Sequence, residues 1–222
     1  MIEVDVGPLA HAVTHDEVGI VEVTADLTLR GTGDGVRWTL SAFYNDYTDF
    51  VYADPTGAFW DNPEEPGDFL PIVEYRQADA KLYGYEAEVN FPLVRGSDHT
   101  LELRLASDYV RGKLDDGRNL PQMPPLRFGA GLHFDQGPLH AGIQAFYNRK
   151  QDDVIDGELP TDGYTMLNID FSYRLPVFGQ QLLLFASGTN LLDEDARLAP
   201  SSPKDIVPLP GRSLRLGARA EF

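Results

Sequence analysis

The sequence contains no cysteine, which excludes disulfide bonds, thiol catalysis and thiolate metal sites. It also lacks any apolar run near the roughly 18 residues that a membrane-spanning helix requires, so a helical membrane protein is excluded. Basic residues are scarce: 18 Lys and Arg stand against 35 Asp and Glu, for a net charge of −17. Because phosphates attract Lys and Arg, we expect no nucleic-acid partner.

Catalytic motifs are missing as well. The chain has no Gly-x-Ser-x-Gly, no His-Glu-x-x-His and no phosphate-binding loop. No serine stands at a suggestive spacing from a histidine. We therefore expect neither an enzyme nor a cofactor. Met1 is not followed by the basic and apolar regions of a signal peptide, so we expect any export signal to lie elsewhere, in a longer chain.

What the chain does contain is repeated alternation of apolar and polar residues. At the C-terminus, Leu214, Leu216 and Phe222 belong to an apolar set, while Arg215 and Arg219 belong to a polar one. A period of two is typical of a β-strand with one apolar face. Further alternating stretches occur at 21–30, 83–91, 101–105, 126–134, 139–147 and 167–173, with less regular ones at 36–53 and 180–191.

Short and long connections alternate between these stretches. The short, turn-like ones lie at 31–35, 92–98, 135–137 and 176–180; the long, acidic and proline-rich ones lie at 54–71, 113–124, 151–163 and 193–210. This asymmetry is typical of outer-membrane barrels, although a soluble up-and-down barrel can share it. We predict an all-β fold: an antiparallel, up-and-down transmembrane β-barrel of about nine or ten strands, part of a larger barrel or a shortened one.

The polar faces of the strands help to distinguish a membrane barrel from a soluble β domain. A soluble β domain would turn the apolar face inward, whereas a wide barrel turns it toward lipid and lines its lumen with charge. Aromatic residues gather near strand ends, as an interfacial girdle would: Tyr44, Tyr47, Phe50, Tyr52, Tyr83, Tyr85, Tyr164 and Phe178. The charges expected in the lumen are Glu86, Glu88, Arg104, Asp108, Asp170, Arg215 and Arg219.

Several stretches resemble the C-terminal half of TonB-dependent outer-membrane receptors. They are "LSAFYNDYTDFVY" (40–52), "YRQADAKLYGYEAEVNFPL" (75–93), "DYVRGKLDDGRNLPQMPP" (108–125), "TDGYTMLNIDFSYRL" (161–175), "GTNLLDEDAR" (188–197) and "PLPGRSLRLGARAEF" (208–222). Two of them, 75–88 and 208–212, are similar to the branch associated with uptake of zinc or other metals. The histidine-containing loop that this branch would show is replaced by "LAPSSPKDIVPLPGR" (198–212).

The resemblance implies a receptor of the Gram-negative outer membrane that takes up a metal ion or a siderophore-like metal chelate. It implies contact with outer-membrane lipid and lipopolysaccharide, and coupling to the TonB complex through an N-terminal plug that this chain does not show. We assign 18–222 to the C-terminal part of the barrel and 1–17 to an N-terminal segment, either a loop or an altered junction.

Alternatives to this assignment stay open at the level of sequence. The chain could be a fragment, or several copies could close one barrel through their open edge strands. It could also be a shortened, non-transporting scaffold or binding module, or a soluble β domain.

Two histidines near the N-terminus form a candidate metal site. His11 and His15 lie four residues apart beside two carboxylates, and imidazole with carboxylate can bind zinc. No obvious third ligand accompanies them, so the alternative is a pair of ordinary loop histidines.

The loop 54–69 is the candidate ligand-binding segment. It carries acids and aromatics but no Lys or Arg, and carboxylates with aromatic rings could attract a cationic or metal-chelate ligand. The alternative is a solvated acidic loop. The candidate residues are Trp60, Asp61, Glu64, Glu65 and Asp68.

The final strand is a candidate assembly signal. By the resemblance, a last strand that ends in an aromatic residue is recognised by the barrel-assembly machinery. We therefore assign that role to Leu214, Leu216 and Phe222, whose apolar face we expect to meet lipid.

Overall fold

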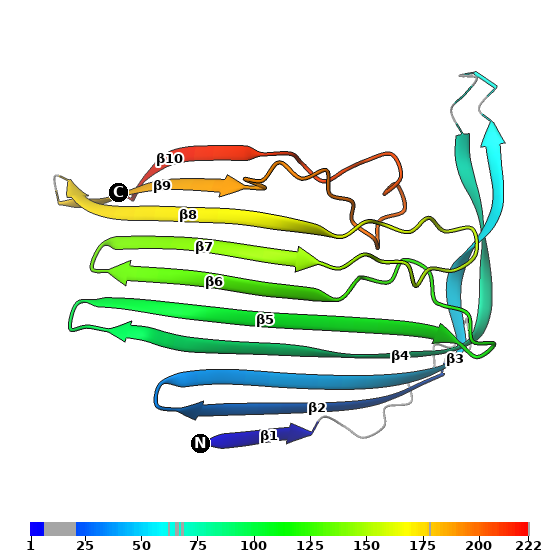
Figure 1. Ribbon diagram of the computed structural model, residues 1–222, viewed down its shortest axis with the longest axis horizontal. Coiled ribbons are helices and arrows are strands. Elements are labelled where there is room, and N and C mark those ends of the chain that lie inside the picture. The colour runs from blue at the N-terminus through cyan, green and yellow to red at the C-terminus, as the bar shows by residue number, and fades with distance from the viewer. Residues whose placement is uncertain (7–20, 62, 65–66, 68, 178, 222) are drawn as a thin grey trace.

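The computed structural model describes residues 1–6, 21–61, 63–64, 67, 69–177 and 179–221. These residues form ten strands and no helix (Figure 1). The strands are β1 (Ile2–Val6), β2 (Val21–Gly33), β3 (Val36–Asp61), β4 (Phe69–Arg95), β5 (His99–Leu114), β6 (Arg127–Gln136), β7 (Leu139–Asn148), β8 (Tyr164–Val177), β9 (Gln180–Thr189) and β10 (Ser213–Glu221). No helix in the described part of the chain is long and apolar enough to cross a membrane.

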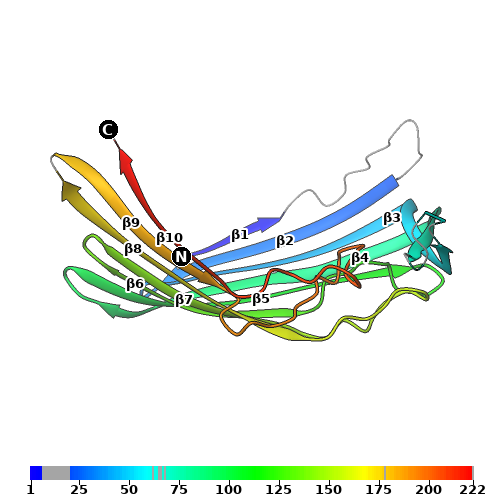
Figure 2. The same ribbon diagram turned by 90° about the horizontal axis from the view of Figure 1, so that it is seen from above.

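The strands make one sheet in sequence order, from β1 to β10, and each strand is antiparallel to the next. The sheet is curved like a segment of a cylinder wall, as Figure 2 shows. The predicted up-and-down antiparallel architecture is confirmed. Among the described strands the wall is open, with β1 along one edge and β10 along the other.

Short turns lie at one end of the sheet and long connections at the other (Figure 1). The β2–β3 turn shows how the sequence sets the short ones. Asp34 and Gly35 both have positive φ, 50° and 79°, as a two-residue hairpin turn requires when its twist matches that of the strands. The predicted asymmetry between the two ends is confirmed.

Register separates the two faces of the sheet as the alternation predicts. On one face Leu105 lies opposite Val89 and Ala130, and on the other Arg104 lies opposite Asn90 and Gly131. We call the face that carries Leu105 the outer face and the face that carries Arg104 the inner face. In antiparallel strands, residues directly opposite each other share a face, so these pairings extend both faces across the sheet.

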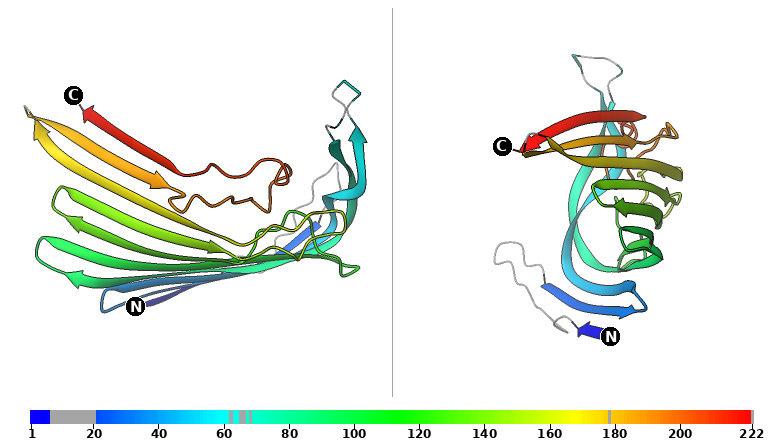
Figure 3. Two further views of the ribbon diagram at one scale, coloured as in Figure 1. Left: turned by 45° about the horizontal axis from the view of Figure 1, so that its top comes forward. Right: turned by 90° about the vertical axis from the view of Figure 1, so that its left-hand side faces the viewer.

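The predicted long loop at 54–71 is wrong in extent. Strand β3 continues to Asp61 and β4 begins at Phe69, so most of this segment is paired strand. We call the part of β3 and β4 between residues 50 and 79, beyond the pairing with β5, the hairpin arm. The arm projects beyond the other strands (Figure 3). Its composition of prolines and acids suggested a loop. Two register shifts on β3, at Tyr47/Phe50 and Pro55/Phe59, accommodate the irregular residues as bulges instead.

The N-terminal residues also differ from a simple loop. Ile2–Val6 forms β1, which pairs with the Leu27–Gly31 part of β2. The alternation of Ile and Val with Glu and Asp in "IEVDV" accounts for the strand. The assignment of 1–17 as a separate segment stays a prediction.

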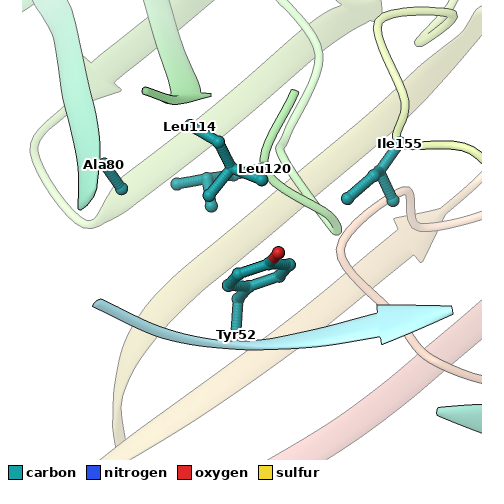
Figure 4. Close-up of a cluster of buried hydrophobic side chains, with 5 residues drawn as sticks. All are labelled: Tyr52, Ala80, Leu114, Leu120 and Ile155. Carbon is teal, nitrogen blue, oxygen red and sulfur yellow. The ribbon is translucent and has the colours of Figure 1, made fainter. Parts of the chain in front are cut away.

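Burial concentrates at the long-loop end. A cluster of five side chains joins β3, β4, β5 and two long connections (Figure 4): Tyr52, Ala80, Leu114, Leu120 and Ile155. Tyr52, expected in an aromatic girdle, is only 5% exposed and belongs to this cluster. Ala80 and Leu114 lie opposite each other on the inner face, so the connections pack against that face.

Candidate functional site

The inner face carries a series of cross-strand ion pairs. Arg104 Nη2 lies 2.5 Å from Glu88 Oε2, and Arg127 Nε lies 2.7 Å from Asp108 Oδ1. Their side chains are between 28% and 50% exposed. Charges at this level of exposure need water or a polar partner beside them, so this face is not the core of a soluble sandwich.

These pairs border a hollow of about 450 Å³ on the inner face. Thr39, Ser41, Glu86 and His133 line it together with the paired charges. Such a surface can bind polar chains or hydrated solutes, which fits the expected wall of a lumen.

Two histidines lie near the short turn between β6 and β7. The rings of His133 and His140 are stacked with their centroids 6.3 Å apart. His140 contacts Asp135 through Nδ1 and Asp170 through Nε2, both at 2.8 Å. By register both side chains lie on the inner face, with Gly131 and Gln144.

The outer face is apolar and open. Leu105, Ile143 and Phe171 are 40%, 44% and 45% exposed, and no second layer of described residues covers them. A hollow of about 530 Å³ on this face is lined by Val89, Leu105, Phe128 and other mostly apolar residues. A single curved antiparallel sheet that is apolar outside and charged inside defines the wall of a transmembrane β-barrel.

The long connections are held together by one buried ion pair. Lys204 Nζ lies 2.5 Å from Glu158 Oε1, and the two side chains are only 5% and 7% exposed. Lys204 Nζ also donates to the carbonyl of Ala199 at 3.2 Å. The carboxylate of Glu158 accepts the backbone N–H of Gln122 at 3.1 Å. Three connections, 115–126, 149–163 and 190–212, therefore meet at this pair; we call them the loop layer.

Asn190 fixes the start of the third connection. It adopts a positive φ of 49°, a conformation that asparagine tolerates well. Its Nδ2 donates to the carbonyls of Glu194 and Pro210 at 3.0 and 3.1 Å, and its Oδ1 accepts the N–H of Glu194. The "NLLDE" segment is thus a turn that joins the end of β9 to the approach of β10.

The base of the hairpin arm is fastened to the loop layer. Asp54 Oδ2 lies 3.1 Å from Arg76 Nη1 and 3.5 Å from Arg118 Nη1, and Arg118 Nη2 donates to the hydroxyl of Tyr52 at 3.2 Å. Hydrogen bonds from the backbone and side chain of Arg118 lower the pKa of Asp116, so this acid stays ionised. Asp54 and Asp116 are therefore both neutralised locally by arginine.

Of the predicted ligand-binding residues, the structure describes Trp60, Asp61 and Glu64, at the far end of the arm. Trp60 and Asp61 are the last residues of β3, and Trp60 is 47% exposed. Glu64 follows on the connection, while Glu65 and Asp68 lie outside the described residues. Asp61 Oδ1 accepts the N–H of Gly67 at 3.4 Å. Their role as a ligand site stays a prediction.

The remaining candidate residues lie at the chain ends. Leu214 and Leu216 are 72% and 83% exposed on β10, on the outer face. Phe222, like His11 and His15, lies outside the described residues. Among the residues that are described, no group of three or more His, Asp or Glu could hold a metal ion.

Sequence reasoning missed Lys204, Glu158 and Asn190 as organisers of the loop layer. The only signal for Lys204 was a single basic residue within an apolar, proline-rich stretch. Its partner lies 46 residues away, and no spacing rule connects them.

The comparisons with known proteins agree with the barrel wall. Residues 21–191, more than half of the chain, match the family model described as TonB dependent receptor-like, beta-barrel. The chain belongs to this TonB-dependent receptor β-barrel family. No curated protein matches the sequence.

Two solved structures resemble the fold. The copper transporter OprC aligns with a TM-score of 0.71 and 22% identity, over 90% of this chain and 32% of OprC. The FrpB iron transporter from Neisseria meningitidis (F3-3 variant) aligns with a TM-score of 0.61 and 15% identity, over 93% of this chain and 31% of FrpB. The chain thus spans about a third of each protein, and at these identities the likeness shows the fold alone.

Proposed function

We propose that the chain is part of the barrel wall of an outer-membrane receptor that takes up a metal ion or a metal chelate. The family match over 21–191, on a sheet that is apolar outside and charged inside, carries this proposal. The two similar structures are a copper transporter and an iron transporter, which supports a metal as the substrate.

The partners follow from the same proposal. Outer-membrane lipid and lipopolysaccharide surround the outer face in a Gram-negative cell, and the barrel-assembly machinery recognises Leu214, Leu216 and Phe222 on the last strand. Energy comes from the TonB complex through an N-terminal plug.

The ligand first meets the tip of the hairpin arm. Trp60, Asp61, Glu64, Glu65 and Asp68 supply carboxylates and an aromatic ring, and the sequence has no Lys, Arg or His between Arg37 and Arg76. An unbalanced run of acids raises the local concentration of cations. The exposed position of Trp60 and Asp61 at the end of the arm supports a role in capture rather than in a closed site.

Uptake in cells tests the function. A strain that produces the complete protein would be compared with a deletion strain for accumulation of copper, iron and zinc, each as free ion and as chelate, measured by mass spectrometry. Higher accumulation of one metal, lost when TonB is removed, is the expected result. Equal accumulation in both strains for all metals would reject the receptor and favour a scaffold.

Variants at the tip test the capture site separately. Asp61→Asn combined with Glu64→Gln should raise the half-saturating metal concentration several-fold by weakening attraction. Asp152→Asn is the matched control, because Asp152 is an exposed loop acid outside the arm. Unchanged uptake in the tip variant, with an active parent protein, would remove these residues from the site.

The pair His11 and His15 is a second proposed metal contact. Zinc titration by calorimetry on the complete protein should lose one binding event in the double variant His11→Ala, His15→Ala. An identical isotherm would mean that the two residues are ordinary loop histidines.

A further inference from the structure

Among the described residues, no strand pairs with the outer edge of β4 in the hairpin arm, and we call this the open edge. Strand β5 pairs with β4 only from Ala80 onward. One more backbone bond, from the N–H of Asp115 to the carbonyl of Asp79 (2.9 Å), closes this pairing. Beyond it, β4 runs to Phe69 paired on its other side alone, with β3. Residues 71–77 are all exposed.

The direction of the free backbone groups follows from Asp79. Its carbonyl points toward β5, and in an antiparallel strand the groups of every second residue point the same way. The N–H and C=O of Val73 and Tyr75 therefore point outward along the open edge. The carbonyl of Ile72 points the other way, since it accepts the hydroxyl of Thr56 on β3 at 2.9 Å. Pro71, which has no N–H, fits an edge position.

Lipid cannot cover this edge. Tyr83 marks the aromatic level of the outer face, where it lies opposite Tyr44 on β3. Tyr75 lies eight residues further along β4, in the part beyond its pairing with β5. In the arm, β3 and β4 turn away from the direction of the other strands at the long-loop end of the sheet (Figure 1). The arm stands beyond the ends of the other strands (Figures 1 and 3). The exposed apolar side chains here, with Tyr75 at 80% and Phe69 at 55%, thus lie outside the hydrocarbon layer.

Charge decides what kind of chain fits the edge. From residue 54 to residue 76 the arm carries one basic residue, Arg76, which pairs with Asp54 and Glu74, and it keeps a net negative charge from its six acids: Asp54, Asp61, Glu64, Glu65, Asp68 and Glu74. A second copy of this arm would bring two acidic ribbons together, which like-charge repulsion opposes. An extended segment with basic and apolar residues in alternation would satisfy both the charge and the exposed apolar side chains.

We propose that the open edge of β4 at Val73 and Tyr75 binds an extended, basic polypeptide segment by adding it as a third strand to the arm. Main-chain hydrogen bonds supply the affinity, and alternate side chains of the added strand supply the selectivity. The partner's lysines or arginines face the acidic arm, and its apolar residues pack on Tyr75, Val73 and Phe69. This docking surface is separate from the capture residues at the tip and does not depend on metal uptake.

Peptide binding to the complete protein in a zwitterionic detergent tests the proposal. The probe is a fluorescent twelve-residue peptide of alternating lysine and valine, and its control has glutamate in place of lysine. The lysine peptide should bind, measured by fluorescence anisotropy, and the glutamate peptide should not. Absence of binding by the lysine peptide would overturn the proposal.

Edge variants separate strand addition from simple charge attraction. Val73→Pro removes the outward N–H and should weaken binding at least about tenfold, whereas Val73→Ala keeps the N–H and should change it by less than about threefold. Equal binding of the lysine peptide by the two variants would mean that charge alone attracts it, and would overturn strand addition. The same test on the unaltered protein uses two lysine peptides, one with its odd-numbered and one with its even-numbered backbone nitrogens methylated. One of the two loses the N–H groups that would pair with β4, so undiminished binding of both peptides would overturn the proposal. A concentration-dependent dimer abolished by Val73→Pro would assign the edge to a second copy and also overturn it.

Discussion

The barrel wall and the loop layer of this chain are stabilised in different ways. In the wall, apolar side chains such as Ile143 (44% exposed) and charged ones such as Arg104 (48% exposed) are both nearly half exposed, because the two faces meet two different surroundings. Outside glycine, every buried residue in the described part of the chain lies at the long-loop end: Tyr52, Asp54, Ala80, Leu114, Leu120, Gln151, Ile155, Thr161, Asn190, Ala196, Ala199 and Lys204.

The two regions therefore depend on different interactions. Continuous ladders of backbone hydrogen bonds define the wall, so single side chains on its inner face contribute little. The loop layer has almost no regular ladder and depends on a few buried groups with several partners each. Changes of one residue should therefore matter far more in the loop layer than in the inner wall.

The largest effect is expected at the buried ion pair. Lys204→Met leaves the Glu158 carboxylate without its cation and should destabilise the loop layer by roughly 3–5 kcal/mol. Hydrogen exchange would then increase in 115–126, 149–163 and 190–212 but not in β6 or β7. The double variant Lys204→Met, Glu158→Leu should recover much of the loss. Lys150→Met is the control, because it breaks the exposed pair Lys150–Asp152, at 3.7 Å. It should change the stability by no more than about 1 kcal/mol.

A smaller effect is expected at Asn190. Asn190→Ala loses three hydrogen bonds and places alanine at positive φ, which should cost about 1–3 kcal/mol of local stability. Asn190→Gly keeps the φ without strain and loses only the hydrogen bonds. Proteolysis of the 190–212 connection should be slowest in the parent protein, faster in Asn190→Gly and fastest in Asn190→Ala. Equal rates for all three would contradict the role of the side chain in joining β9 to β10.

A still smaller effect is expected on the inner wall. Arg104→Met breaks the pair with Glu88, whose side chains are 48% and 38% exposed, and should change stability by about 0–1 kcal/mol. Thermal unfolding followed by circular dichroism measures it. A loss comparable to that of Lys204→Met would remove the distinction between wall and loop layer.

The smallest effect is a loosening of the β5–β6 connection in acid. Because the pKa of Asp116 is lowered by its bonds from Arg118, its contribution is complete at neutral pH and disappears as pH falls through the lowered pKa. Protease sensitivity at 115–118 should rise in that range for the parent protein. Asp116→Asn should show the higher sensitivity already at neutral pH and little further change in acid.

The sequence predicted the wall better than the loop layer for a physical reason. Alternation is a local signal, and stretches such as 101–105 and 139–147 each carry it within one strand. The hairpin arm was hidden because Pro55 and the acids around it resemble loop composition, although Val51, Phe59 and Trp60 favour a strand. Its cross-strand pairing, which decides the matter, is not visible in either strand alone.

The candidate site was predicted only in part. Trp60 and Asp61 were expected together on an exposed acidic segment, and the structure places them at the end of the arm. The buried pair of Lys204 and Glu158 could not be predicted, since charged residues in proline-rich connections are normally solvated. Only the packing of three connections removes them from water.

A membrane-spanning wall places Ile143 and Ala145 on β7 toward lipid and Gln144 toward the lumen. This chain has no cysteine, so each of these residues can be replaced singly by cysteine and spin-labelled in the complete protein in liposomes, after any cysteine outside this chain has been changed to serine. Labels at 143 and 145 should relax faster with oxygen, which dissolves in lipid, and the label at 144 should relax faster with a water-soluble nickel chelate. The reverse pattern, or no alternation, would contradict a membrane-spanning wall.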